Sequence, residues 1–133
     1  KNDMQGCLSA ANMTANFVID LRENWANSAN KFFDSLAAGK PIFLNHGGWM
    51  QDLVSNYQCG LCMYEKEMDV VAKELDIAIS NDTWLRSSGY NAKKLAIKFF
   101  DRDIHIKQLE KILILTKENK SESICDIAKG IYY

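Results

Sequence analysis

The apolar residues of the first third of the chain recur at spacings of three and four, as on one face of an α-helix. We expect this helix to span residues 9–38, because Gly39 and Pro41 follow it and both residue types commonly end helices. Its apolar stripe consists of Val18, Leu21, Trp25, Ala29, Phe32 and Leu36.

The same spacing over residues 48–79 predicts a second helix of about eight turns. Gly60 lies inside this stretch, where it costs about 1 kcal/mol relative to alanine and permits a kink. Between the two helices we expect a loop over residues 39–48, whose apolar residues 42–44 fold back onto the core. The second stripe consists of Met50, Leu53, Tyr57, Leu61, Tyr64, Met68, Val71, Leu75 and Ile79.

Shorter apolar patterns predict further helices around residues 90–100, 106–116 and 124–131. Residues 112–115 could form a buried strand, but the sequence offers no obvious partner strand. The pattern therefore predicts an all-α fold, an irregular bundle of about four or five helices. We expect it to form one domain over residues 1–133.

The composition is that of an ordinary globular domain, with 47% hydrophobic and 25% charged residues among 133. No apolar run approaches the ~18 residues of a membrane-spanning helix, so we expect no membrane span. The formal net charge of -1 gives no general attraction to nucleic acid, which we exclude as a partner.

The four cysteines, Cys7, Cys59, Cys62 and Cys125, admit three interpretations. Cys59 and Cys62 form a C-x-x-C motif, but a redox site of this type belongs at a strand-to-helix junction, not inside a helix. Structural zinc needs four ligands, usually as two close pairs, whereas this chain has one pair and two distant residues. We favour two disulfide bonds that join Cys7 and Cys125 to the middle of the second helix, in either pairing.

Two disulfide bonds imply an oxidising compartment, so we expect a periplasmic or extracellular location. Three N-glycosylation sequons, at Asn12, Asn81 and Asn119, weakly support secretion.

Little in the sequence points to catalysis. His46 precedes Gly47 and Gly48, and such a loop at the start of a helix could hold an anion or form part of an oxyanion hole. The commoner role of two glycines is simply to make the turn. No nucleophile elbow, phosphate-binding loop, dinucleotide fingerprint or calcium loop accompanies them. We therefore expect no enzyme activity, no cofactor and no metal site.

The hypothesis that remains is a small secreted or periplasmic protein-binding module, of the inhibitor or immunity type, whose partner is another protein. Loops on rigid frames tend to carry function, so we take Phe43, His46 and Trp49 as the candidate contact residues. The alternatives are a helical carrier of a small apolar ligand and a cytosolic zinc-stabilised domain.

Overall fold

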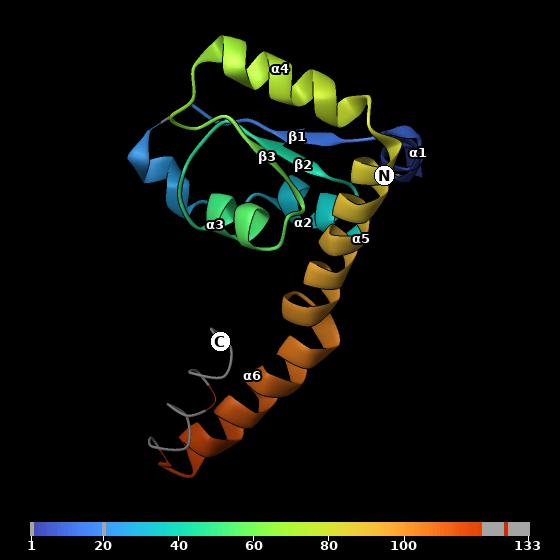
Figure 1. Ribbon diagram of the computed structural model, residues 1–133. Helices are drawn as coiled ribbons and strands as arrows, with labels where there is room; N and C mark the ends of the chain where they lie inside the picture. Colours follow the sequence, from blue (N-terminus) through green and yellow to red (C-terminus); the bar gives the residue numbers. More distant parts are fainter. Residues whose placement is uncertain (1, 20, 121–126, 128–133) are drawn as a thin grey trace. The chain divides into compact units, whose positions relative to one another are not determined.

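Figure 1 shows the computed structural model, which describes residues 2–19, 21–120 and 127. The chain divides into two compact units, residues 1–96 and residues 97–133. The two units are described separately below.

The first unit contains a three-stranded parallel sheet of strand order β1-β2-β3. The strands are β1 (Thr14–Asn16), β2 (Ile42–Leu44) and β3 (Gly60–Cys62). Helix α2 (Asn30–Ala37) lies between β1 and β2 in the sequence, and α3 (Trp49–Asn56) lies between β2 and β3. Because parallel neighbours need a crossover connection, these two helices complete a βαβαβ unit.

The core of this unit lies between the sheet and the two crossover helices (Figure 1). Ile42 and Leu44 of β2 have no exposed surface, which confirms that this apolar segment reaches the core. From the helices, Phe32 and Leu36 of α2 and Val54 of α3 are buried against it. The burial of these side chains provides the main stabilisation of the unit.

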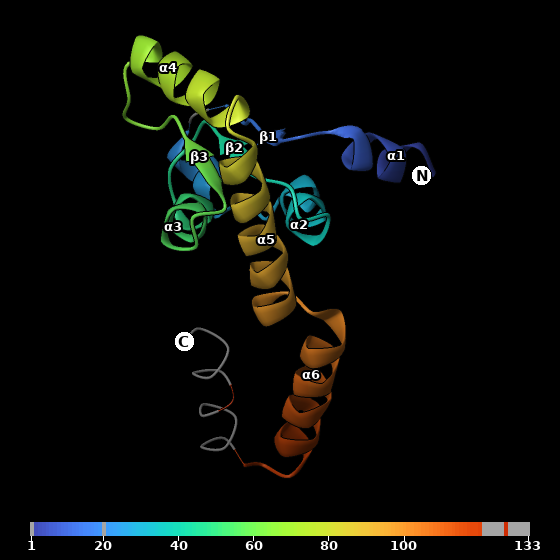
Figure 2. The ribbon, with the colours of Figure 1, turned by 45° about the vertical axis from the view of Figure 1, so that its right-hand side comes forward.

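The remaining elements of the first unit surround this core. The N-terminal helix α1 (Asn2–Ala10) is largely exposed, and a short 3₁₀ helix, η1 (Arg22–Ala26), precedes α2. Helix α4 (Met68–Ile79) lies on the opposite side of the sheet from α2 and α3 (Figures 1 and 2). Helix α5 (Asp82–Phe99) begins in this unit and buries Ala92 and Leu95.

The second unit contains the end of α5 and helix α6 (Arg102–Lys117). Asp101 caps α6, because its carboxylate accepts hydrogen bonds from the backbone N–H groups of Asp103 and Ile104. The Nε2 atom of His105 lies 2.6 Å from the carbonyl oxygen of Phe99, the last residue of α5. No residue of α6 is buried.

The prediction of an all-α bundle is wrong, because the first unit contains a parallel sheet. Its strands β1 and β3 lie within the two predicted helices, and β2 lies within the predicted loop between them. Residues 9–38 contain the end of α1, then β1, η1 and α2. Residues 48–79 contain α3, β3 and α4. The apolar residues keep a spacing of three and four across these segments, because a strand of three residues is too short to change it. The pattern therefore predicted helix where the structure has strands. The predicted helix over residues 124–131 lies outside the described residues, apart from Ile127.

The prediction of two disulfide staples is also wrong. Cys7, Cys59 and Cys62 are free thiols, of which Cys7 is exposed and Cys59 is buried. Cys125 lies outside the described residues. The predicted pairing assumed that Cys59 and Cys62 share one face of a long helix, whereas they lie before and at the end of strand β3. Among the described residues, no helix combines the length and the hydropathy that a membrane crossing requires.

Candidate ligand site at the carboxyl edge of the sheet

The three strands end side by side at one edge of the sheet, which we call the carboxyl edge. Their last residues are Asn16 in β1, Leu44 in β2 and Cys62 in β3. Asn16 pairs with Leu44, and Leu44 pairs with Cys62. In open sheets of parallel strands, ligands bind in the crevice outside this edge. The segments that leave these three residues are therefore the first place to look for a site.

The central strand leads into a glycine turn and a helix N-terminus. After β2 the chain passes through Asn45, His46, Gly47 and Gly48 and enters α3 at Trp49. Gly48 has φ 92° and ψ -168°, a backbone conformation that is essentially restricted to glycine. Gly48 is the N-cap residue of α3 and makes no side-chain capping hydrogen bond. The N–H groups of its first turn therefore remain suitable for an external acceptor.

Asn45 fixes this turn to the segment that follows β1. Its side-chain oxygen accepts a hydrogen bond of 3.0 Å from the backbone N–H of Val18. Its side-chain nitrogen donates one of 2.7 Å to the carbonyl oxygen of the same residue. Two bonds between the Asn45 side chain and the backbone N–H and C=O of Val18 hold the two loops in a fixed position, which a preorganised site requires.

Two buried polar side chains at this edge each keep one atom without a hydrogen-bond partner, Asn16 Oδ1 and His46 Nε2. The side-chain nitrogen of Asn16 lies 3.5 Å from the sulfur of Met50, in the first turn of α3. The Nδ1 atom of His46 lies 2.8 Å from the carbonyl oxygen of Gly47. Because a carbonyl oxygen only accepts, Nδ1 carries the proton in the neutral ring and Nε2 is an acceptor. Both atoms without a partner are thus acceptors.

A lysine brings positive charge to the same edge. The Nζ atom of Lys31 donates a hydrogen bond of 3.1 Å to the carbonyl oxygen of Phe17, the residue that follows β1. Lys31 lies in the first turn of α2, which starts at Asn30. The N-terminus of α2 and that of α3 therefore lie at this edge together with the ammonium group.

Aromatic side chains border the glycine turn. Trp25 of η1 and Tyr64, which follows β3, meet edge to face with 4.9 Å between their ring centroids. A Cβ atom on Gly47 would lie 3.1 Å from the Tyr64 ring, and one on Gly48 would lie 2.8 Å from the Cβ of Trp25. The backbone of the turn thus lies in close contact with Trp25 and Tyr64, which leaves no room for a side chain at Gly48.

The structure distributes the predicted contact residues around the turn. Phe43 is the middle residue of β2, and its ring lies 5.3 Å from that of Phe17. His46 has no exposed surface. Trp49 is the first residue of α3 and its ring stacks near Phe33, at 6.1 Å. Their role in binding a protein partner stays a prediction.

Sequence reasoning missed Asn16, Lys31 and Asn45. The signal that could have found this edge is the succession of an apolar trio, Asn-His-Gly-Gly and a helix start over residues 42–49. That order is typical of a strand, a glycine turn and an anion-binding helix N-terminus.

Of the two C-x-x-C cysteines, Cys62 ends β3 at the carboxyl edge, whereas Cys59 precedes β3 at its other end, and both thiols stay protonated near neutral pH. Burial raises the pKa of the Cys59 thiol from 9.0 to about 11. Burial also raises the pKa of Cys62, whose sulfur lies 3.4 Å from the carbonyl oxygen of His46. Nucleophilic and metal-binding cysteines act as thiolates, so neither thiol is prepared for that role near neutral pH. In the described part of the chain, no three His, Cys, Asp or Glu side chains gather to hold a metal ion.

The raised pKa of Cys59 makes the stability of the fold depend on alkaline pH. Between pH 9 and 11 the unfolded thiol is ionised while the folded thiol is not, so the unfolded state binds fewer protons. We expect the free energy of unfolding to fall by roughly 2–3 kcal/mol across this interval because of Cys59. Urea denaturation of the native protein and of Cys59→Ala at several pH values measures this contribution. If the two proteins lose stability in parallel, the assignment to Cys59 is wrong, and exposed Cys7→Ser serves as the matched control.

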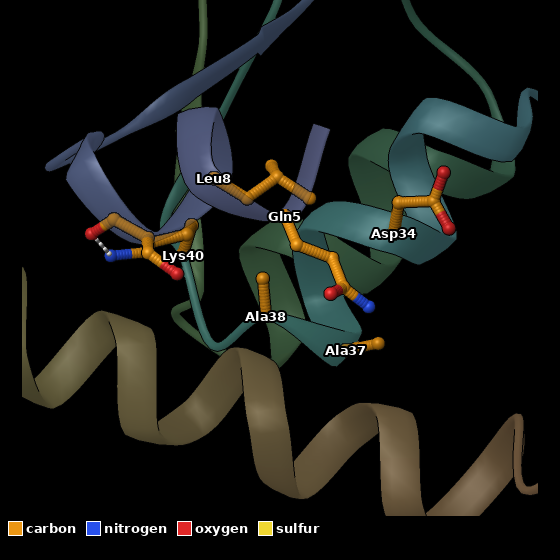
Figure 3. A pocket seen from close by; sticks show the side chains of 7 residues that line it. Gln5, Leu8, Asp34, Ala37, Ala38 and Lys40 are labelled. Carbon is orange, nitrogen blue, oxygen red and sulfur yellow. Dashed lines mark hydrogen bonds between the residues drawn. The ribbon is translucent and has the colours of Figure 1, made fainter. Parts of the chain in front are cut away.

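A separate cavity of about 630 Å³ lies away from this edge, where α1 approaches the end of α2 (Figure 3). Gln5 and Leu8 of α1 face Asp34 and Ala37 of α2 across it. Lys40 is turned toward the carbonyl oxygen of Ser9, which it reaches at 3.2 Å. Asp34 and Ala37 are exposed and most of α1 is exposed, so this cavity is a shallow gap between two helices.

Comparisons of the chain with protein-family models, with curated proteins and with solved structures find no match. The site itself is therefore the basis for any functional argument.

Proposed function

We propose that the first unit, residues 1–96, binds a phosphorylated small molecule such as a nucleotide at the carboxyl edge of its sheet. The observation that carries this proposal is the Gly47-Gly48 turn, which joins the central strand to the uncapped N-terminus of α3. Backbone N–H groups and the helix dipole favour a phosphate group at such a terminus.

The topology supports the same ligand class. Three consecutive parallel strands joined by two helices form the mononucleotide-binding half of doubly wound sheets. In such sheets the first residues after the strands contact the ligand, and phosphate sits at a helix N-terminus. Here the strand order β1-β2-β3 matches such a half, but the glycine turn follows β2, whereas in that fold the turn after the first strand carries the glycines.

The side chains at the edge fit a ligand that has both phosphate and hydroxyl groups. The buried acceptor atoms of Asn16 and His46 call for a hydrogen-bond donor, because buried polar atoms in proteins nearly always have a partner. Because neither atom is exposed, a hydroxyl group of the ligand can reach them only through a bridging water molecule. Lys31 in the first turn of α2 opposes the dipole of its own helix, so an anionic ligand explains its position better than helix stability does.

Replacement of Lys31 tests the proposal. We expect Lys31→Gln to weaken the binding of inorganic pyrophosphate and of adenosine diphosphate roughly tenfold, because one charge-assisted hydrogen bond is lost. Isothermal titration calorimetry measures both affinities. The exposed Lys94→Gln on α5 changes the net charge equally at another place and should leave both affinities unchanged.

Two results would contradict the proposal. One is the absence of binding by either compound at millimolar concentration to the folded native protein. The other is an equal loss of affinity in Lys31→Gln and Lys94→Gln, which would indicate general attraction to positive charge. Binding of the nucleotide but not of pyrophosphate would indicate that the nucleotide binds elsewhere than at the helix N-terminus, and that result also contradicts the proposal.

A protein-binding role remains a second proposal, now supported by a different surface. Helix α6 leaves large apolar side chains about half exposed, and apolar surface of this kind favours contact with another protein. These side chains are Ile104, Ile106, Leu109, Leu113 and Ile114. A periplasmic or extracellular location was inferred from disulfide bonds, and the described cysteines give it no support.

A further inference from the structure

A second pocket in the first unit lies at the opposite end of β3 from the carboxyl edge. It has a volume of about 470 Å³ and opens between the end of α3, the start of β3 and helix α5. Val54 of α3 and Ser88 of α5 are nearly fully buried and lie at its base. The half-buried Trp84 and Asn91, both from α5, line it together with Gln58 and the exposed Ser87.

The backbone around this pocket is held by side-chain hydrogen bonds. Asn91 donates a hydrogen bond of 3.3 Å from its side-chain nitrogen to the carbonyl oxygen of Gln58. Gln58 has a positive φ of 50°, so this bond stabilises a turn that its residue type rarely adopts. At the other side, the carboxamide oxygen of Asn81 accepts from the N–H of Trp84 at 2.9 Å and caps α5. Both walls of the pocket are thus fixed before a ligand arrives.

The chemistry of the lining selects a neutral, polar ligand. No lining residue carries a charge, so a charged ligand would lose its hydration without gaining a counter-ion. The side-chain nitrogen of Asn91 and the hydroxyl of Ser87 already donate to backbone carbonyl oxygens, of Gln58 and Trp84 respectively. A purely apolar ligand would still cover the side-chain oxygen of Asn91 and the carboxamide of Gln58 without giving them a hydrogen-bond partner. A ligand with several hydroxyl groups can form hydrogen bonds with both, while one of its faces covers the Trp84 ring.

We propose that this pocket is a binding site for a sugar ring. A pyranose has hydroxyl groups around its edge and an apolar face of C–H groups, which match the amides and the indole ring respectively. The site differs from the proposed phosphate site in position and in ligand chemistry, so either can exist without the other.

The test is a titration of the ¹⁵N-labelled protein followed by NMR. D-glucose and N-acetyl-D-glucosamine should shift the Trp84 indole, the Asn91 side-chain amide and the backbone amides around residues 55–60, with a Kd on the order of a few millimolar. Uracil, a planar base without a sugar ring, and inorganic phosphate should leave these signals in place. In Ser87→Tyr a large side chain fills the mouth of the pocket, and we expect the Kd to rise roughly tenfold or more.

Ser80→Tyr is the matched control, because Ser80 is exposed at the end of α4 and lies outside the pocket. It should bind both sugars like the native protein. The proposal fails if neither sugar moves the pocket signals, if uracil moves them more than the sugars do, or if both tyrosine variants lose affinity equally. The dispersion of the amide signals reports whether each variant is folded, and Trp84→Leu provides a second loss-of-binding variant should Ser87→Tyr not fold.

Discussion

Replacement of Gly60 by alanine should destabilise the first unit by about 3 kcal/mol or more. A Cβ atom at this position would overlap the carbonyl oxygen of Ile42 and come within 2.7 Å of its backbone nitrogen. Both are backbone atoms of the central strand, so the overlap can be relieved only if β2 and β3 separate. Guanidinium denaturation followed by circular dichroism measures the loss.

The sign of this effect distinguishes a strand from a helix at Gly60. In a continuous helix over residues 48–79, alanine would stabilise the chain by up to about 1 kcal/mol relative to glycine. Gly6→Ala is the matched control, because Gly6 lies in α1 and a Cβ atom there would meet nothing within 4 Å. If Gly60→Ala behaves like Gly6→Ala, the parallel pairing of β2 with β3 is wrong.

The predicted apolar stripes identify only part of the core. Phe32, Leu36, Met50 and Val71 of these stripes are buried, whereas Leu21, Met68 and Ile79 are exposed. The assignment of those stripes to two long helices failed because burial alone does not separate a short parallel strand from a helix turn. A strand of three residues has no room for alternation, and strands buried on both faces do not alternate in any case.

Two local signals did indicate the ends of elements. Gly39 and Pro41 follow α2, and Gly39 has a φ of 66°, as expected for a glycine after a helix. Gly60 suggested a weak point in the second helix, where the structure has the start of β3. A glycine in a strand commonly marks a close approach of two backbones, which is its role beside Ile42.

The candidate site was only partly accessible to sequence reasoning. The anion-binding role of the segment from His46 to Gly48 could be stated as one option, because a glycine turn before a helix is a local feature. The roles of Asn16, Lys31 and Asn45 could not, since each depends on the parallel pairing of β1 with β2. The disulfide prediction failed for the same reason, because it placed Cys59 and Cys62 on a helix that does not exist.

Gly48→Ala should destabilise the first unit by roughly 3 kcal/mol and also abolish phosphate binding. Its φ of 92° and ψ of -168° cost a residue with a side chain about 1–3 kcal/mol. The added methyl group would in addition lie 2.8 Å from the Cβ of Trp25 and 3.1 Å from the Trp25 carbonyl oxygen. Relief of either contact rotates the peptide groups whose N–H groups, in the first turn of α3, would bind the proposed phosphate. Thermal unfolding and pyrophosphate calorimetry measure the two effects.

Gly47→Ala tests whether the losses in Gly48→Ala arise from the backbone conformation of Gly48 or only from the added methyl group in a crowded turn. Its added Cβ would meet the Tyr64 ring at 3.1 Å and the side-chain oxygen of Gln51 at 3.3 Å, and these side chains can move slightly. We therefore expect Gly47→Ala to lose less than half the stability that Gly48→Ala loses and to retain measurable pyrophosphate binding. Equal losses in the two variants would mean that the special backbone of Gly48 is not what shapes the turn. Unchanged pyrophosphate affinity in a folded Gly48→Ala would place the anion elsewhere than at the N-terminus of α3.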